Sequence, residues 1–175
     1  MKQKLTNPAW DDLRAPATGI NPAGSAASAT VDTEDGSLLF ANGQVQTVAI
    51  TFQMPHTWKV GTDVSFHIHW CKTTAAAGTV KWQAKYKWTN IGDVIPPFSA
   101  FSDGTEAIPN SDIANKHAIF EFTDYFGVGK TISSQITIVL QRNTTGDTYG
   151  ATVKLLEADI HYQVDSFGSG QEYVK

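Results

Sequence analysis

Alternation of apolar and polar side chains is the dominant pattern in this chain. Residues 48–54, 63–70 and 80–88 each repeat with a period of two. That period places every second side chain on the same face of a β-strand. The pattern therefore predicts three strands, each with one face turned toward a core. In the second strand the apolar face holds Val64, Phe66, Ile68 and Trp70, and the polar face holds Ser65, His67 and His69.

Further strands are expected at residues 38–40, 117–123, 134–141 and 151–164, with turn-forming residues between them. No segment has the period of an amphipathic helix. Seven or eight alternating strands bury their apolar faces by packing two sheets together. The predicted fold is an all-β antiparallel β-sandwich, with a jelly-roll as the first choice.

Residues 1–35 differ from the remainder, because prolines, glycines and small residues interrupt any regular period. They are interpreted as an extended N-terminal arm, and residues 36–175 as the β-sandwich domain. Apolar arm residues should dock either on their own domain or on a neighbouring subunit. Removal of the arm is expected to leave the sandwich folded. The candidate partner-binding residues, from the arm and the C-terminal segment, are Trp10, Leu13, Arg14, Ile20, Phe167 and Tyr173.

Residues 91–115 are rich in Gly, Pro, Ser and Asp. This is long for a connection within a compact domain, and no regular element is expected there. A contact role is the natural interpretation of such an excursion.

Composition and charge narrow the function classes. With 175 residues the chain is predicted to form one domain, and its 17% of charged residues suits a surface partly covered by partners. The net charge of −4 and the scattered basic residues argue against a nucleic-acid partner. Cys71 is the sole cysteine, so no intrachain disulfide can form. No apolar run resembles a signal peptide or a membrane span, so no membrane partner is expected.

His67 and His69 are the sharpest candidates for chemistry. Two histidines two positions apart on a strand project from the same face and could bind one metal ion. The spacing from Gly61 also matches the start of the first cupin motif, but Thr73 and Thr74 stand where a cupin glutamate is due. The second cupin motif has no counterpart. Hydrogen bonding within the sheet or an intersubunit contact is the favoured alternative to metal binding.

The final strand offers further ligands, since Glu157, Asp159 and His161 alternate onto one face. The candidate metal ligands are His67, His69 and His161, and their meeting depends on strand order. No other cofactor is expected. A nucleophile motif, a P-loop and a dinucleotide-binding motif are all absent from the sequence, which predicts no catalytic residues and a protein that is not an enzyme.

The aromatic residues raise a carbohydrate-binding sandwich as a further alternative. Trp70, Trp82 and Trp88 fall on the apolar faces, where core packing is the default. Trp58 is the expected exposed aromatic. Lys81, Lys85 and Lys87 are interpreted as a solvated sheet face, with an acidic partner as the alternative.

Three stretches resemble a family of tailed-bacteriophage virion proteins that are mostly uncharacterised or minor structural components. They are PAWDDLRAPATGINP at 8–22, QMPHTWKVGTDVSFHIHW at 53–70 and LLEADIHYQVDSFGSGQEYVK at 155–175. One departure is Gly170, where the family is associated with a basic residue. This difference argues against charge-mediated docking of the C-terminal segment in this chain.

The resemblance implies a virion component assembled in the cytoplasm of a bacterial host. A decoration or cement protein that binds the major capsid protein is the expected function. A tail, neck or head-fibre protein is the first alternative, and a cupin-like metal-binding protein or enzyme is the second. A homo-oligomer is expected, with a trimer favoured.

Overall fold

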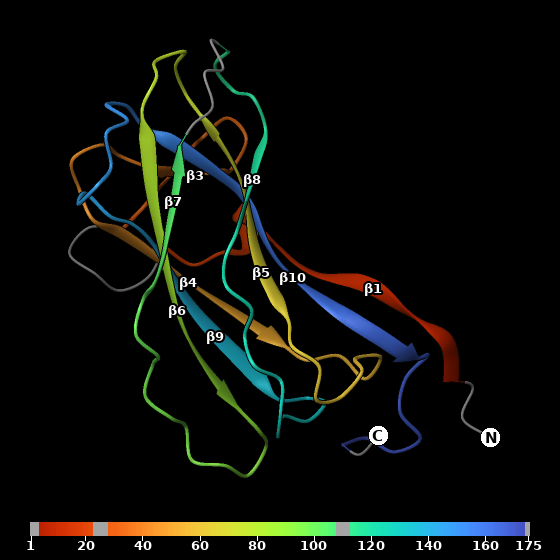
Figure 1. Cartoon of the computed structure of the whole chain (residues 1–175). Coiled ribbons are helices and arrows are strands. Elements are labelled where there is room, and N and C mark those ends of the chain that lie inside the picture. The colour runs from red at the N-terminus through yellow and green to blue at the C-terminus, as the bar shows by residue number, and fades with distance from the viewer. Residues whose placement is uncertain (1–3, 23–27, 108–112, 174–175) are drawn as a thin grey trace.

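The computed structural model describes residues 4–22, 28–107 and 113–173, with the strands arranged in two sheets (Figure 1). The first sheet has the strand order β2-β3-β10-β5-β8, and β1 pairs with β10. All its neighbouring strands are antiparallel. Its strands are β1 (Lys4–Pro16), β2 (Thr30–Val31), β3 (Leu38–Phe40), β5 (Ser65–Lys72), β8 (Ala118–Glu121) and β10 (Val153–Ser166).

The second sheet has the order β4-β9-β6-β7, again fully antiparallel. Its strands are β4 (Gln46–Gln53), β6 (Thr79–Thr89), β7 (Ser102–Ala107) and β9 (Gln135–Arg142). A short 3-10 helix, η1 (Ala17–Gly19), follows β1. Within the described ranges no helix is long and apolar enough to cross a membrane.

Strand pairing is nested from the outside inward. Strand β3 pairs with β10, β4 with β9, β5 with β8, and β6 with β7. A long antiparallel hairpin that is rolled up in this way yields two facing sheets, which is the jelly-roll arrangement. The predicted antiparallel β-sandwich of jelly-roll type is therefore confirmed.

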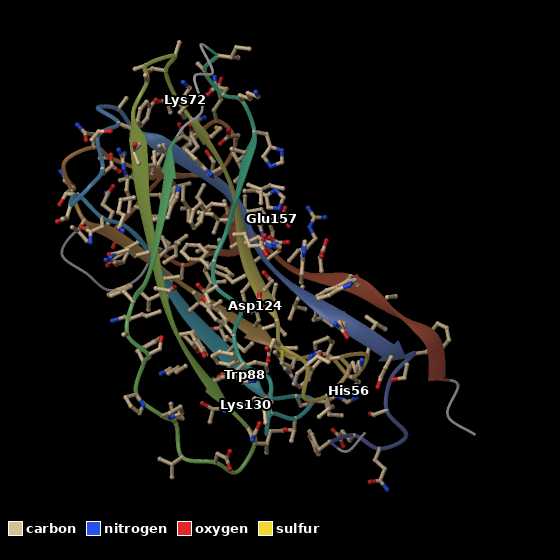
Figure 2. All side chains as sticks on the ribbon, viewed as in Figure 1. His56, Lys72, Trp88, Asp124, Lys130 and Glu157 are labelled. Carbon is tan, nitrogen blue, oxygen red and sulfur yellow. The ribbon has the colours of Figure 1, made fainter. Side chains whose placement is uncertain are left out.

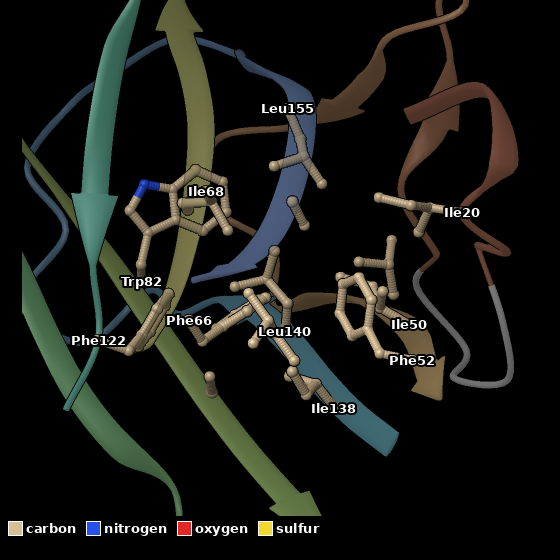
Figure 3. Close-up of a cluster of buried hydrophobic side chains, with 14 of the residues drawn as sticks. Ile20, Ile50, Phe52, Phe66, Ile68, Trp82, Phe122, Ile138, Leu140 and Leu155 are labelled. Atoms are coloured by element: carbon tan, nitrogen blue, oxygen red, sulfur yellow. The ribbon is translucent and has the colours of Figure 1, made fainter. Parts of the chain in front are cut away.

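The core lies between the sheets and is made of the predicted apolar faces (Figure 3). Phe66 and Ile68 of β5 face Ile138 and Leu140 of β9, and all four side chains are fully buried. Complete burial of one such side chain stabilises the fold by about 1.5–3 kcal/mol. The alternation read from the sequence thus identifies the side chains that hold the two sheets together.

The N-terminal segment is integrated into the domain. From Ala9 to Pro16, β1 pairs residue by residue with β10, and Ala17, Ile20 and Ala29 belong to the core. Of the two alternatives for the arm, docking on its own domain is the one present in the chain. Removal of residues 1–35 would uncover core surface, and the expectation that the sandwich survives it stays a prediction. Residues 1–3 and 23–27 of the predicted arm lie outside the described residues.

The segment 91–115 contains β7, which the sequence did not predict. Its sequence, SDGTEA, has no apolar alternation. Among the strands that the structure describes, β7 pairs with β6 alone, at the edge of the second sheet. Backbone hydrogen bonds to the long strand β6 hold β7 in place, so it forms although its sequence lacks the alternation typical of a strand.

Candidate functional site

A polar cluster occupies the outer face of the first sheet, on the side opposite the core. Strand register builds it: His67 of β5 lies across from Asp159 of β10 on one side and from Glu121 of β8 on the other. Asp12 of β1 lies across from His161 of β10. Side chains at alternate positions of adjacent strands share a face, so four strands contribute to the same patch.

The centre of the cluster is formed by His67, Asp159 and His161, whose ligand-type atoms all lie within 4.8 Å of one another. The Asp159 Oδ2 atom lies 3.0 Å from His161 Nε2 and 3.9 Å from His67 Nδ1. The imidazole rings of His67 and His161 meet edge to face with centroids 4.1 Å apart. Asp159 and His67 are buried, whereas His161 reaches the surface.

A ring of polar partners surrounds this centre. The hydroxyl of Ser65 donates to Glu121 Oε1 over 2.9 Å, and that oxygen also lies 3.4 Å from His67 Nε2. Asp12 Oδ1 lies 2.9 Å from His161 Nε2. Nε2 of His67 therefore faces a carboxylate on β8, and Nε2 of His161 lies between the carboxylates of Asp12 and Asp159.

His69 lies beside the centre rather than in it. Its Nδ1 is 2.7 Å from Nε2 of His117, and the two rings stack. Its Nε2 lies 3.5 Å from Asp159 Oδ1. The structure therefore brings together two of the three predicted metal ligands, His67 and His161, and replaces His69 by Asp159. The alternation of Glu157, Asp159 and His161 was the signal for this residue, but strand order decided which ligands meet.

Electrostatics within the cluster favour ionised carboxylates. Interaction with Asp159 raises the pKa of His67, against the opposing effect of burial, and Glu121 adds to the increase. Burial disfavours the Asp159 carboxylate, yet the adjacent His67, His161 and His69 hold its pKa below the usual value. The Ser65 hydroxyl and then His67 lower the pKa of Glu121.

Arg14 and Glu157 flank the cluster where β1, β10 and β5 are paired. Figure 2 labels Glu157 on β10. The Arg14 Nε and Nη2 atoms both donate to the Glu157 carboxylate, the latter over 2.6 Å. This ion pair raises the pKa of the Arg14 guanidinium. Arg14, predicted to bind a partner, thus has an intramolecular partner in this chain.

The other predicted partner-binding residues divide into two groups. Ile20 is a core residue and the partly buried Leu13 packs against the core, so both contact their own domain. Trp10, Phe167 and Tyr173 are each more than half exposed. Those three side chains remain accessible to a partner.

Trp58, the expected exposed aromatic, is fully buried. Its ring packs against Trp88 with centroids 5.5 Å apart, and its Nε1 donates to Thr62. The lysines of β6 do lie on an outer face, but Lys85 and Lys87 rest over the rings of Phe98 and Phe101 rather than standing free in solvent.

Exposed apolar side chains gather at one end of the sandwich, which we call the loop end: residues 54–64, 90–101, 122–134 and 167–173. Figure 1 shows these segments together at the lower end of the view. Hydrogen bonds join them, since Asn90 donates to the Gly129 carbonyl and His56 contacts both Ser133 and Ser169. The exposed large apolar residues of the loop end are Val60, Ile91, Val94, Ile95, Phe101, Phe126, Val128, Phe167 and Tyr173.

No known family model matches the sequence, and no curated protein matches it. Among solved structures, a CBM36-1 domain of a multidomain xylanase from the hindgut metagenome of Trinervitermes trinervoides is 11% identical with a TM-score of 0.48, covering 92% of this chain and 100% of that one. The insecticidal delta-endotoxin Cry8Ea1 from Bacillus thuringiensis is 8% identical with a TM-score of 0.45, covering 87% and 23%.

A family 22 carbohydrate-binding module of Clostridium thermocellum Xyn10B is 11% identical with a TM-score of 0.40, covering 91% of this chain and 88% of that one. Similarities at this level carry no inference about what this chain binds. The sandwich architecture rests on the strand pairing of the chain itself.

Proposed function

We propose that this chain is a non-enzymatic structural subunit of a tailed-phage virion, and that it decorates the capsid by binding the major capsid protein. The observation that carries the proposal is the concentration of exposed apolar side chains at the loop end. The resemblance of residues 8–22, 53–70 and 155–175 to virion proteins is the reason for proposing a virion as the assembly.

The loop end has the character of a protein interface. Val94 is 92% exposed, Val128 79%, Phe167 78% and Phe126 68%. Isolated apolar residues on a surface are ordinary, but many exposed apolar side chains on neighbouring loops at one end of a molecule favour an interaction site. Burial of these side chains against a partner would provide the main driving force for attachment.

Rigid support beneath the loop end suits docking. The side chains of Trp58, Trp88 and Tyr125 are buried below it, and backbone bridges join Trp58 to Val164 and Val64 to Tyr125. Loops held in one conformation lose little entropy on binding. A symmetric trimer would present three such ends to a capsid lattice, and multivalent contact would strengthen individually weak interfaces.

Purified particles of the source phage provide the test. An antibody against this chain should label intact virions, and an electron-microscopy map should place the subunit on the outer surface of the head. Labelling of the tail, neck or head fibres would support the alternative structural function. Absence of the chain from gradient-purified particles would overturn the virion proposal.

A binding assay tests the surface itself. The double variant Phe126→Ser, Val128→Ser should lose co-sedimentation with capsids that lack the decoration protein, because the apolar contact is removed. The matched control is Val31→Ser: Val31 is 53% exposed on β2, whose pairing with β3 places it at the opposite end of β10. Equal binding by both variants would exclude the loop end as the docking surface.

A further inference from the structure

We infer that His67, Asp159 and His161 form a binding site for one divalent transition-metal ion of the zinc type, set between the neighbouring strands β5 and β10. The inference does not depend on the proposed virion function. Geometry, a buried carboxylate oxygen that makes no hydrogen bond with the described residues, the residue that orients His67, and charge all support it.

Strand pairing sets His67 directly across from Asp159, and His161 follows Asp159 by two positions on the same face. The ligand-type atoms of the three residues lie within 4.8 Å of one another. Metal bonds to histidine nitrogen and carboxylate oxygen are about 2.0–2.2 Å long, so one ion can bridge ligands with such separations after small side-chain rotations.

One oxygen of the buried Asp159 carboxylate makes no hydrogen bond with the described residues. The Asp159 side chain is 3% exposed, and among the described residues its Oδ1 atom accepts no hydrogen bond; the nearest charged group is His69 Nε2, 3.5 Å away. Buried carboxylate oxygens are normally hydrogen-bonded or bound to a metal, because desolvation without compensation is costly. A cation bound by Asp159 would supply the missing interaction.

The surrounding residues already orient the ligands. His67 Nε2 lies 3.4 Å from the Glu121 carboxylate and 3.3 Å from the Ser65 hydroxyl, and Nδ1 faces the Asp159 side. With the proton on Nε2, the Nδ1 lone pair would be free to bind a metal ion. Carboxylates that hold the far nitrogen of a ligating histidine are typical of zinc sites. Glu121 would act in this way on His67.

Charge also favours a cation. The carboxylates of Asp12, Glu121, Glu157 and Asp159 surround the site, whereas Arg14 is the adjacent guanidinium and is already paired with Glu157. A divalent ion would offset this excess of negative charge. His161 is 37% exposed, so one coordination position faces solvent and would be filled by water.

The ligand types select the class of metal. Two imidazoles with one carboxylate suit zinc and its neighbours in the transition series, while Mg²⁺ and Ca²⁺ prefer sites made of oxygen ligands. His69 is not required, because its Nδ1 is engaged with His117.

Equilibrium dialysis of the purified full-length chain with Zn²⁺, followed by elemental analysis, tests the inference. We expect one zinc per chain and no uptake of Mg²⁺. Asp159→Asn and His67→Ala should abolish uptake, and Glu121→Gln should weaken it by about 10–100-fold. His69→Ala should retain it. His56→Ala is the matched control, since His56 lies at the loop end between Ser133 and Ser169.

A second measurement guards against variants that fail to fold. Co²⁺ bound to the wild type should give the visible absorption bands of a site with nitrogen and oxygen ligands, and Zn²⁺ should raise the midpoint of thermal unfolding in the wild type but not in Asp159→Asn. Substoichiometric uptake by the wild type, or equal uptake by wild type and Asp159→Asn, would overturn the inference. Either result leaves the virion proposal unaffected, because no particle is involved.

Discussion

The guanidinium of Arg142 and the carboxylate of Asp147 form a two-point ion pair within the sandwich. Nε donates to Oδ2 over 2.7 Å and Nη2 donates to Oδ1 over 2.9 Å. Arg142 is 1% exposed, and its remaining N–H groups donate to the carbonyls of Phe40, Tyr149 and Ala151. This side chain therefore links the end of β9 to β3 and to the loop that leads into β10.

Removal of the acidic partner should be strongly destabilising. Asp147→Ala leaves a buried guanidinium uncompensated, and we expect a loss of about 3–5 kcal/mol in the free energy of unfolding, measured by urea denaturation. Asp124→Ala is the control, because Asp124 is exposed and surface substitutions stay within about 0.5 kcal/mol. Similar unfolding midpoints for the two variants would contradict this account of Arg142.

At Tyr125, in contrast to Asp147, removal of the polar group should not destabilise the fold. The Tyr125 hydroxyl is buried and has no hydrogen-bond partner within the described part of the chain, and burial raises its pKa far above the usual value. Tyr125→Phe removes this desolvation penalty and should leave stability unchanged or increase it by about 1 kcal/mol. Tyr149→Phe should instead destabilise by a similar amount, because the Tyr149 hydroxyl accepts from Thr74 N and donates to Thr74 O. Thermal unfolding of both variants makes the comparison, and a destabilised Tyr125→Phe would refute it.

Asp32 and Lys154 form a pH-dependent contact between the β2–β3 turn and β10. The ion pair of 2.7 Å with Lys154, followed by the hydrogen bond from the backbone N–H of Glu34, lowers the pKa of Asp32 below its ordinary value of 3.8. A depressed pKa means that this stabilisation is complete above about pH 4 and is lost as pH falls through the folded-state pKa.

Carbon-13 NMR titration of the Asp32 carboxyl should therefore show a midpoint below 3.8 in the wild type. Lys154→Gln should raise that midpoint and flatten the acid limb of the stability curve, whereas Lys154→Arg should preserve both. An unchanged midpoint in Lys154→Gln would show that the lysine does not stabilise the ionised carboxylate.

Gly127 is required by close packing beneath the loop end. A Cβ atom at this position would lie 1.9 Å from the carbonyl oxygen of Thr62 and 2.9 Å from the ring of Trp58. Gly127→Ala should destabilise the fold by about 1–3 kcal/mol, because the backbone at Thr62 must move. At Gly150 the added methyl meets open space, so Gly150→Ala is the control. Urea denaturation of the two variants measures the difference, and equal stability would contradict the predicted clash.

The local hydrophobic pattern was sufficient to predict a strand wherever burial of one face determines that strand. The alternation at 48–54, 63–70 and 80–88 predicted β4, β5 and β6 and their core faces, because a period of two leaves no other face for the apolar side chains. It failed at β7, whose pairing is made by the backbone, and at β1, where the prolines in Lys4–Pro16 concealed a strand paired with β10.

The sequence predicted which side chains of the candidate site share a face within one strand, but not which strands lie next to each other. The sequence by itself placed His67 and His69 on one polar face and Asp159 and His161 on another, since alternation within a strand is local. Only the tertiary structure decided that β5 and β10 are neighbours, and their register sets Asp159 across from His67 while His69 turns to His117. Register depends on contacts between residues far apart in the chain, and no local period encodes it.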